Sequence, residues 1–163
     1  MTPKLRLTAL AAALASAAIL SLPPPASAAD EHKQEQGAAT THKLTLNQGK
    51  KWATDEPLRN GMTEIRRLLA AQDEAIHKGK LKPADYTALG AKIEGEVGGI
   101  VANCKLEPAA DANLHLILEG VIEGADAMQG KAKGKTPRQG AGKVVAALNE
   151  YGRYFDHPGW KRF

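Results

Sequence analysis

The chain has 163 residues, of which 22 are basic, 18 are acidic and 4% are aromatic, with a formal net charge of +4. Lys4 and Arg6 belong to the expected signal peptide, so the mature chain should carry +2, which is too near neutral to indicate nucleic-acid binding. Cys104 is the single cysteine, so no disulfide can form within the chain.

The first 28 residues have the pattern of a secretory signal peptide. Two basic residues precede an apolar run over 7–22, which is followed by three prolines and the cleavage site Ala26-Ser27-Ala28. No later apolar run approaches the roughly 20 residues that a membrane-spanning helix needs. We therefore expect export to the periplasm and no transmembrane segment in the mature protein.

Residues 29–53 are mostly polar, and we expect a flexible segment whose last part straps onto the folded domain. Cleavage after Ala29 instead of Ala28 would place Asp30-Glu31-His32 at the new N-terminus. A free amine, two amides and an imidazole then form the square-planar donor set that Cu(II) and Ni(II) prefer.

Residues 54–163 predict one all-α domain, because apolar residues recur at spacings of three and four and no segment alternates as a strand does. Asp55 or Thr54 is suited to cap the first helix, and Pro57 suits its first turn. The expected helices cover 54–77, 83–104, 108–129 and 142–155. Short connections between helices of similar length favour an up-down-up-down four-helix bundle.

This topology places four soft or borderline metal ligands at one end of the bundle. They are Met62, Cys104, His115 and His157. Sulfur and imidazole favour copper, zinc or haem iron over calcium or magnesium, so the sequence predicts a metal site with copper or a haem-like group as the occupant. The alternative is that Met62 and Cys104 are core residues of a cofactor-free interaction or structural bundle.

The other end of the bundle collects positive charge. Its basic residues are Lys78, Lys80, Lys82, Lys131, Lys133, Lys135 and Arg138. Cations there complement the negative ends of two helix dipoles. Docking of an acidic partner or an anionic lipid is the alternative, and such binding would weaken with salt. The connection over 130–140 is rich in lysine and glycine, so we expect it to be mobile.

Glycines interrupt the second and third predicted helices. Gly95 with Gly99, and Gly120 with Gly124, lie one turn apart and form smooth patches. Each interior glycine costs a helix about 1 kcal/mol relative to alanine. Close packing between these two helices would offset that cost, and so would a flat ligand lying against the backbone.

Several of these features resemble the soluble four-helix b-type cytochromes of the periplasm and the related c-prime cytochromes. The resemblance rests on the signal peptide, the helix order and three segments, which are Asn60-Gly61-Met62, the stretch 114–120 and Asn149-Glu150-Tyr151. It implies a bundle in which a haem is held by the methionine and by a histidine directly after the tyrosine. Here that residue is Gly152, and the chain has no C-x-x-C-H attachment sequence.

Enzyme signatures are missing from the sequence. It contains no G-x-S-x-G, H-E-x-x-H or P-loop pattern, and its glutamate pairs lack the E-x-x-H spacing of di-iron bundles. We therefore expect no catalysis, and the residues assign no oligomeric state.

Overall fold

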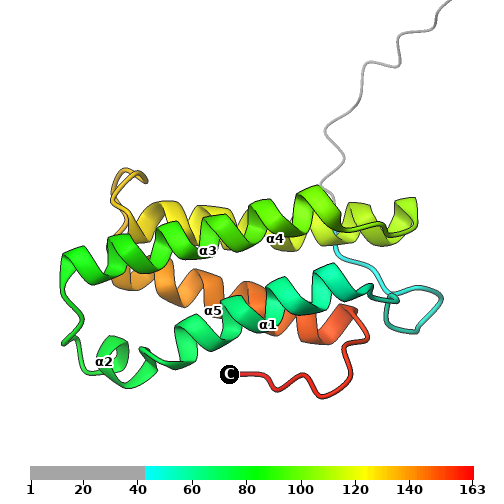
Figure 1. The fold of residues 1–163 in the computed structure, drawn as a ribbon, viewed down its shortest axis with the longest axis horizontal. Helices are drawn as coiled ribbons and strands as arrows, with labels where there is room; N and C mark the ends of the chain where they lie inside the picture. Colours follow the sequence, from blue (N-terminus) through cyan, green and yellow to red (C-terminus); the bar gives the residue numbers. More distant parts are fainter. Residues whose placement is uncertain (1–42) are drawn as a thin grey trace, which may run out of the picture. The chain divides into compact units, whose positions relative to one another are not determined.

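The computed structural model describes residues 43–163, which contain five α-helices and no strand. The predicted signal peptide, residues 29–42 and the His32 copper motif lie outside the described residues. The helices are α1 (Glu56–Ala70), α2 (Asp73–His77), α3 (Pro83–Asn103), α4 (Pro108–Met128) and α5 (Pro137–Tyr154) (Figure 1). The all-α class is therefore confirmed for this part of the chain, in which no helix is long and apolar enough to cross a membrane.

The start of α1 follows its sequence signals. The Asp55 carboxylate caps the helix by accepting a hydrogen bond from the Leu58 amide at 3.0 Å, and Pro57 lies in the first turn. Below the cap, one face is fully buried at Leu58, Met62, Ile65 and Leu69. Each such side chain contributes about 1.5–3 kcal/mol when it is removed from water.

The first predicted helix is interrupted. The sequence predicts a continuous helix over 54–77, but the structure divides it into α1 and α2. The positions three and four residues after the buried Leu69 are Gln72 and Asp73, so the apolar line that would support a longer helix has a gap of one turn. Asp73 and Glu74 instead lie in the first turn of α2, where acidic side chains are favoured.

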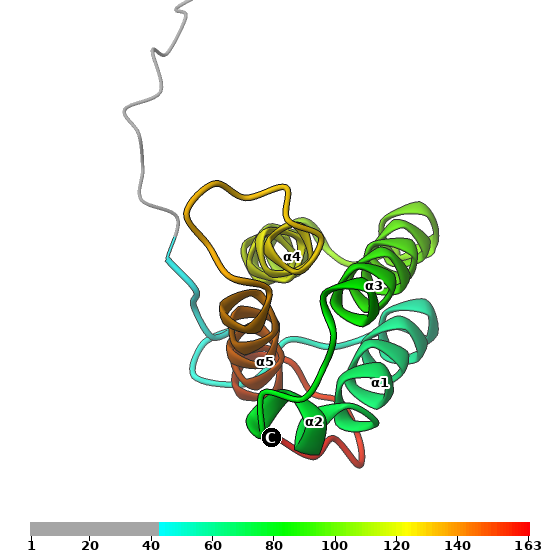
Figure 2. The ribbon, with the colours of Figure 1, turned by 90° about the vertical axis from the view of Figure 1, so that its left-hand side faces the viewer.

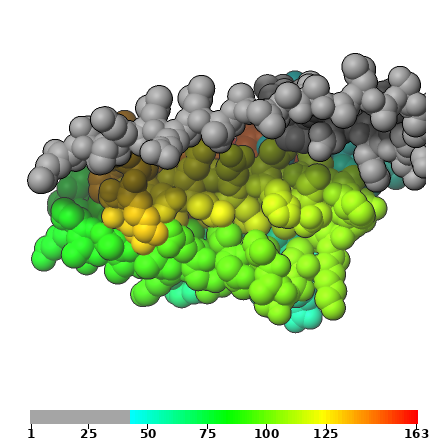
Figure 3. Space-filling view, turned by 90° about the horizontal axis from the view of Figure 1, so that it is seen from above, coloured from blue at the N-terminus to red at the C-terminus, as the bar shows by residue number. Residues whose placement is uncertain are grey.

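Helices α3 and α4 match the predicted ranges within one residue at each end. Both begin at a proline, whose fixed φ and missing N–H suit the first helical position. Cys104 lies just outside α3 as its C-cap, with an extended backbone, and is partly buried. Figure 3 shows α3 in green and α4 in yellow lying side by side on one face of the molecule.

Helix α5 begins five residues earlier than predicted. Thr136 accepts a hydrogen bond from the Gln139 amide, and the Gln139 side chain accepts one from the Thr136 amide, which makes a capping box. Pro137 then opens the helix. The capping box and the proline were the signals for this start, so the predicted loop over 130–140 shrinks to residues 129–136.

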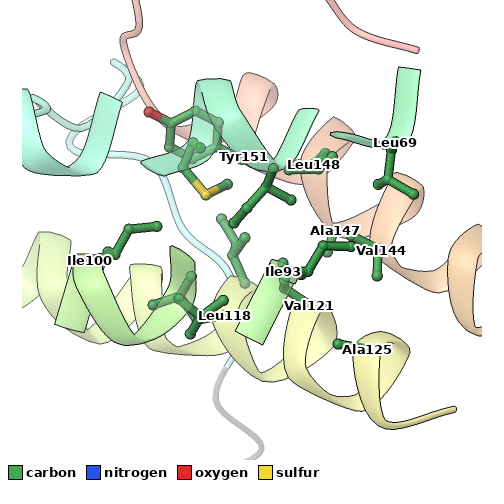
Figure 4. Packing of buried hydrophobic residues seen from close by; sticks show 14 of the residues in the cluster. Leu69, Ile93, Ile100, Leu118, Val121, Ala125, Val144, Ala147, Leu148 and Tyr151 are labelled. Carbon is green, nitrogen blue, oxygen red and sulfur yellow. The ribbon is translucent and has the colours of Figure 1, made fainter. Parts of the chain in front are cut away.

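The core lies between the four long helices, which Figure 2 shows nearly end-on. The tightest helix pair is α4 with α5, followed by α3 with α4 and α1 with α3, whereas α1 and α5 touch only sparsely. In Figure 4, side chains from all four helices point into the shared space, among them Leu69, Ile93, Val121, Leu148 and Tyr151.

The glycine patches differ from the prediction. Gly95 and Gly99 of α3 are exposed, and nothing lies within 4 Å of the place where a Cβ would be, so they pack against no helix. Gly124 instead permits the close α4–α5 contact, because its Cβ would lie 2.6 Å from Val144 and 2.8 Å from the Gly140 carbonyl oxygen. The close packing at this patch therefore joins α4 to α5 instead of α3 to α4.

The segment before α1 packs onto the helices. Trp52 is buried, its amide donates to the Tyr154 carbonyl at 2.8 Å, and its indole N–H donates to the Thr45 carbonyl at 2.6 Å. The Thr45 amide in turn donates to the Asn113 side chain at 2.8 Å. Residues 43–52 thus fasten the chain to α4 and to the end of α5.

Candidate functional site

The end of the domain that contains Cys104 is organised around Asp55. The Cys104 thiol donates to Asp55 Oδ1 at 3.5 Å, and the Lys105 amide donates to Asp55 Oδ2 at 2.6 Å. Since Asp55 also caps α1, one carboxylate joins the start of α1 to the end of α3. The sequence indicated the cap, but the link to residues 50 positions away could not be read from local signals.

This arrangement keeps the Cys104 thiol protonated. Burial and the neighbouring Asp55 carboxylate raise the pKa of the thiol to about 12. Burial alone would raise the pKa of Asp55 too, but hydrogen bonds from the amides of Lys105 and Leu58 outweigh it, and the pKa of this carboxyl falls below its usual value. The thiolate is the form that attacks electrophiles and binds metals, so Cys104 is poorly suited to either task here.

His157 belongs to a separate polar contact beside α5. Its Nδ1 lies 2.9 Å from the Tyr151 hydroxyl, and its Nε2 lies 3.5 Å from the Thr63 hydroxyl. Burial and the nearby Arg59 guanidinium lower the pKa of His157, so the ring is neutral near pH 7. A neutral ring donates from one nitrogen and accepts at the other, which satisfies both hydroxyl partners.

The other two predicted ligands lie in different surroundings. Met62 is fully buried in the core. His115 is 64% exposed, and its Nδ1 lies 2.9 Å from the carbonyl oxygen of Asp111 on its own helix. No group of three or more His, Cys, Asp or Glu side chains within 43–163 is arranged to hold a metal ion.

The position of the second haem ligand in the cytochrome resemblance is covered by aromatic side chains. A Cβ at Gly152 would lie 2.6 Å from the indole Cδ1 and Nε1 of Trp160. Trp160 also meets the Tyr151 ring edge to face at 4.8 Å, and Tyr151 stacks on Phe155 at 5.4 Å. Because residue 152 has no side chain and Trp160 fills the space beside it, the residues present do not fit a haem held between residues 62 and 152.

The Trp160 packing was not foreseen from the sequence. Its indole N–H is buried without a hydrogen-bond acceptor in the described part of the chain. The close approach of Trp160 to Gly152 depends on how the C-terminal segment folds back, which local sequence signals do not specify.

At the lysine-rich end of the domain, only some of the positive charges are paired with carboxylates. Lys78 pairs with Glu74, and Lys131 pairs with Glu94 at 2.7 Å and Asp126 at 3.4 Å. Lys80, Lys82, Lys133 and Lys135 have no carboxylate at ion-pair distance within residues 43–163. The last two line a hollow of about 660 Å³ between the end of α4 and the start of α5, together with Lys131 and Lys143. We call this hollow the lysine hollow.

Two acidic side chains also line the lysine hollow. Glu123 pairs with Lys143, and Asp126 pairs with Lys131. These pairs leave Lys133 and Lys135 as the unneutralised charges of the hollow. Gly130 and Gly134 adopt positive φ values of 75° and 71° in the same connection, which shapes the turn that presents both lysines.

Comparison with known proteins adds no family. No family model matches the chain, and no curated protein or solved structure matches it at a significant level. The resemblance to b-type and c-prime cytochromes therefore rests on the sequence motifs alone.

Proposed function

We propose that this protein is a non-enzymatic, periplasmic interaction module without a cofactor, in which the four long helices form an up-down-up-down bundle. Its lysine hollow docks an acidic polypeptide. The observation that carries the proposal is the hollow itself, where Lys133 and Lys135 project from a turn with no carboxylate partner in the described chain. The Cys104 end of the domain supports the proposal indirectly. Its polar groups hydrogen-bond to each other instead of remaining available to a ligand.

The shape and charge of the hollow favour an acidic peptide over an anionic membrane. A concave site admits a carboxylate side chain, whereas a lipid surface would meet only the rim. Glu123 and Asp126 within the hollow would also be brought close to lipid phosphates. The capping box of α5 satisfies the amides of Thr136 and Gln139, so the two unpaired lysines would supply most of the attraction.

The test is binding of the mature protein to a fluorescent glutamate-rich peptide at 50 and 200 mM salt. The variant Lys133→Gln/Lys135→Gln should bind about tenfold more weakly, because each exposed charge contributes up to about 1 kcal/mol. The matched control, Lys50→Gln/Lys161→Gln, removes two exposed lysines from elsewhere on the domain and should bind as wild type. Equal losses in both double variants would contradict a specific hollow. Binding to phosphatidylglycerol vesicles without binding to the peptide would overturn the choice of partner.

The competing proposal is a copper-like ion or a haem-like group held by Met62, Cys104, His115 and His157, in metal handling, electron transfer or stress response. Tyr151 contacts His157, and its pKa is raised by burial and then by the charges of Cys104 and Asp55, so Cys104 and His157 belong to the same end of the domain, which favours this proposal. Visible absorption and metal analysis of protein purified from periplasm distinguish the two. A haem spectrum, or stoichiometric copper, zinc or iron that is lost in Cys104→Ala, would overturn the cofactor-free proposal.

A further inference from the structure

A second hollow lies between α2 and α5 and has a different character. It encloses about 330 Å³, and its walls include Leu69, Ile76, Val145 and Phe163. Concave, mostly apolar sites of this size between helices are where proteins bind small molecules. We call it the apolar hollow, and it shares no lining residue with the lysine hollow.

The fold creates this space for two reasons. Helices α1 and α5 touch only sparsely, and the break after α1 brings α2 to the start of α5, where residues of both helices line the hollow. The last residues of the chain form the remaining wall. The Phe163 amide donates to Asn149 Oδ1 at 3.0 Å, and the Arg66 guanidinium lies 5.0 Å from the Phe163 ring centre.

One end of the apolar hollow carries a positive charge. Arg138 lines the hollow and donates to the His77 carbonyl at 3.3 Å, and it pairs with no carboxylate within residues 43–163. Asp73 at the same end lies 3.0 Å from the His77 ring. The guanidinium therefore keeps most of its donors free beside an apolar surface, and Arg suits bidentate binding of a carboxylate.

We infer that the apolar hollow binds a small amphiphilic anion, a medium-chain fatty acid, with its carboxylate on Arg138 and its alkyl chain between Leu69, Ile76 and Phe163. The volume lies at the low end of the range for ligand sites, which favours a medium chain over a long one. Each methylene that the hollow covers should raise the affinity about fourfold until the space is filled.

Gly142 offers a way to close the hollow without damage to the fold. It lines the hollow on an exposed face of α5, and nothing lies within 4 Å of the place where its Cβ would be. Gly142→Leu should therefore fill the space while it favours the helix, and Gly142→Ala should fill much less of it. Arg138→Gln removes the charge alone, and Arg153→Gln is the matched control on the same helix, outside the hollow.

The experiment is calorimetric titration of the mature protein with decanoate and decanol, each below its aggregation limit, with hexanoate and octanoate as shorter chains. Wild type and Arg153→Gln should bind decanoate about tenfold more tightly than decanol, and Arg138→Gln should lose that preference. Gly142→Leu should bind neither ligand, whereas Gly142→Ala should still bind both.

The thermal midpoint of Gly142→Leu should equal or exceed that of wild type, which shows that loss of binding is not loss of folding. The inference is overturned if decanoate does not saturate the wild type, if its affinity is independent of chain length, or if Gly142→Leu binds as wild type does. Because the two hollows share no residue, the Gly142 variants should bind the acidic peptide of the proposed function normally, so either proposal can fail alone.

Discussion

The two ends of the helical domain treat their polar groups in opposite ways. At the Cys104 end, Asp55 bonds to the thiol of Cys104, and Tyr151 bonds to His157. At the lysine-rich end, Lys133 and Lys135 line an open hollow without a carboxylate partner in the described residues. Groups that bond internally hold a fold together, whereas charges left in water are free to meet another molecule.

The difference between the two ends also shows that the type of a residue is weaker evidence for function than the availability of its polar atoms. A residue type alone, such as a cysteine or methionine, indicates a ligand site only if its donor atoms are available. Met62 is fully buried in the core, and burial together with the Asp55 carboxylate keeps Cys104 in its thiol form, which is the weaker metal ligand. An exposed lysine charge costs little free energy in water, so the presence of a lysine says little about function. The clustering of several lysines on one turn of the structure is more informative.

The largest expected effect is at Met62. Met62→Ala should lower the free energy of unfolding by about 2–5 kcal/mol, because it leaves a cavity in a fully buried position. Met62→Leu nearly conserves volume and should cost less than about 1.5 kcal/mol. Urea unfolding measures both. A Met62→Leu protein that keeps its stability but loses a bound metal would show that the sulfur is a ligand. It would also contradict the contrast drawn between the two ends of the domain.

A smaller effect is expected at Asp55. Asp55→Ala should cost about 1–3 kcal/mol, since it removes a helix cap and leaves the Lys105 amide without its acceptor. Asp55→Asn keeps a good capping side chain but removes the carboxylate charge that adds to burial in raising the pKa of Cys104. Its thiol should therefore react faster with iodoacetamide at pH 8 than the wild-type thiol. Equal alkylation rates would contradict the proposed influence of Asp55.

The lowered pKa of His157 predicts a modest dependence of the free energy of unfolding on pH. Its pKa in the folded protein is lowered from 6.5, mainly by burial and then by Arg59, so the unfolded chain takes up the proton first as the pH falls. The contribution of this group to stability is therefore complete above pH 6.5 and is lost as the pH falls from 6.5 through the lowered pKa. His157→Gln should flatten this part of the urea-unfolding profile between pH 8 and 5. An unchanged slope would contradict the role given to this histidine.

Local sequence signals predicted most of the helices. Apolar spacing gave the buried face of α1, and proline placed the starts of α3 and α4. The break between α1 and α2 was missed because the two acidic residues Asp73 and Glu74 are compatible with either a continuous helix or a new one. The early start of α5 was missed because a lysine- and glycine-rich connection hid the Thr136 capping box.

The sites were harder to predict, because contacts across the fold decide them. The spacing of Cys104 placed it on an inward stripe, but its environment depends on Asp55, which is far away in the sequence. The same holds for Gly152, whose surroundings are set by Trp160 in the C-terminal segment. Both hollows depend on how separate helices meet, which hydrophobic periodicity does not specify.

The smallest expected effect on stability is at the lysine hollow. Lys133→Gln/Lys135→Gln should change the free energy of unfolding by less than about 0.5 kcal/mol, because exposed charges without partners contribute little to the fold. Removing two neighbouring positive charges should, if anything, stabilise the connection slightly at low salt. Urea unfolding at 50 and 500 mM salt measures this, with Lys131→Gln as the comparison, since that lysine pairs with Glu94 and Asp126. A loss above about 1 kcal/mol in the double variant would mean that these lysines support the fold, and the contrast between the two ends would fail.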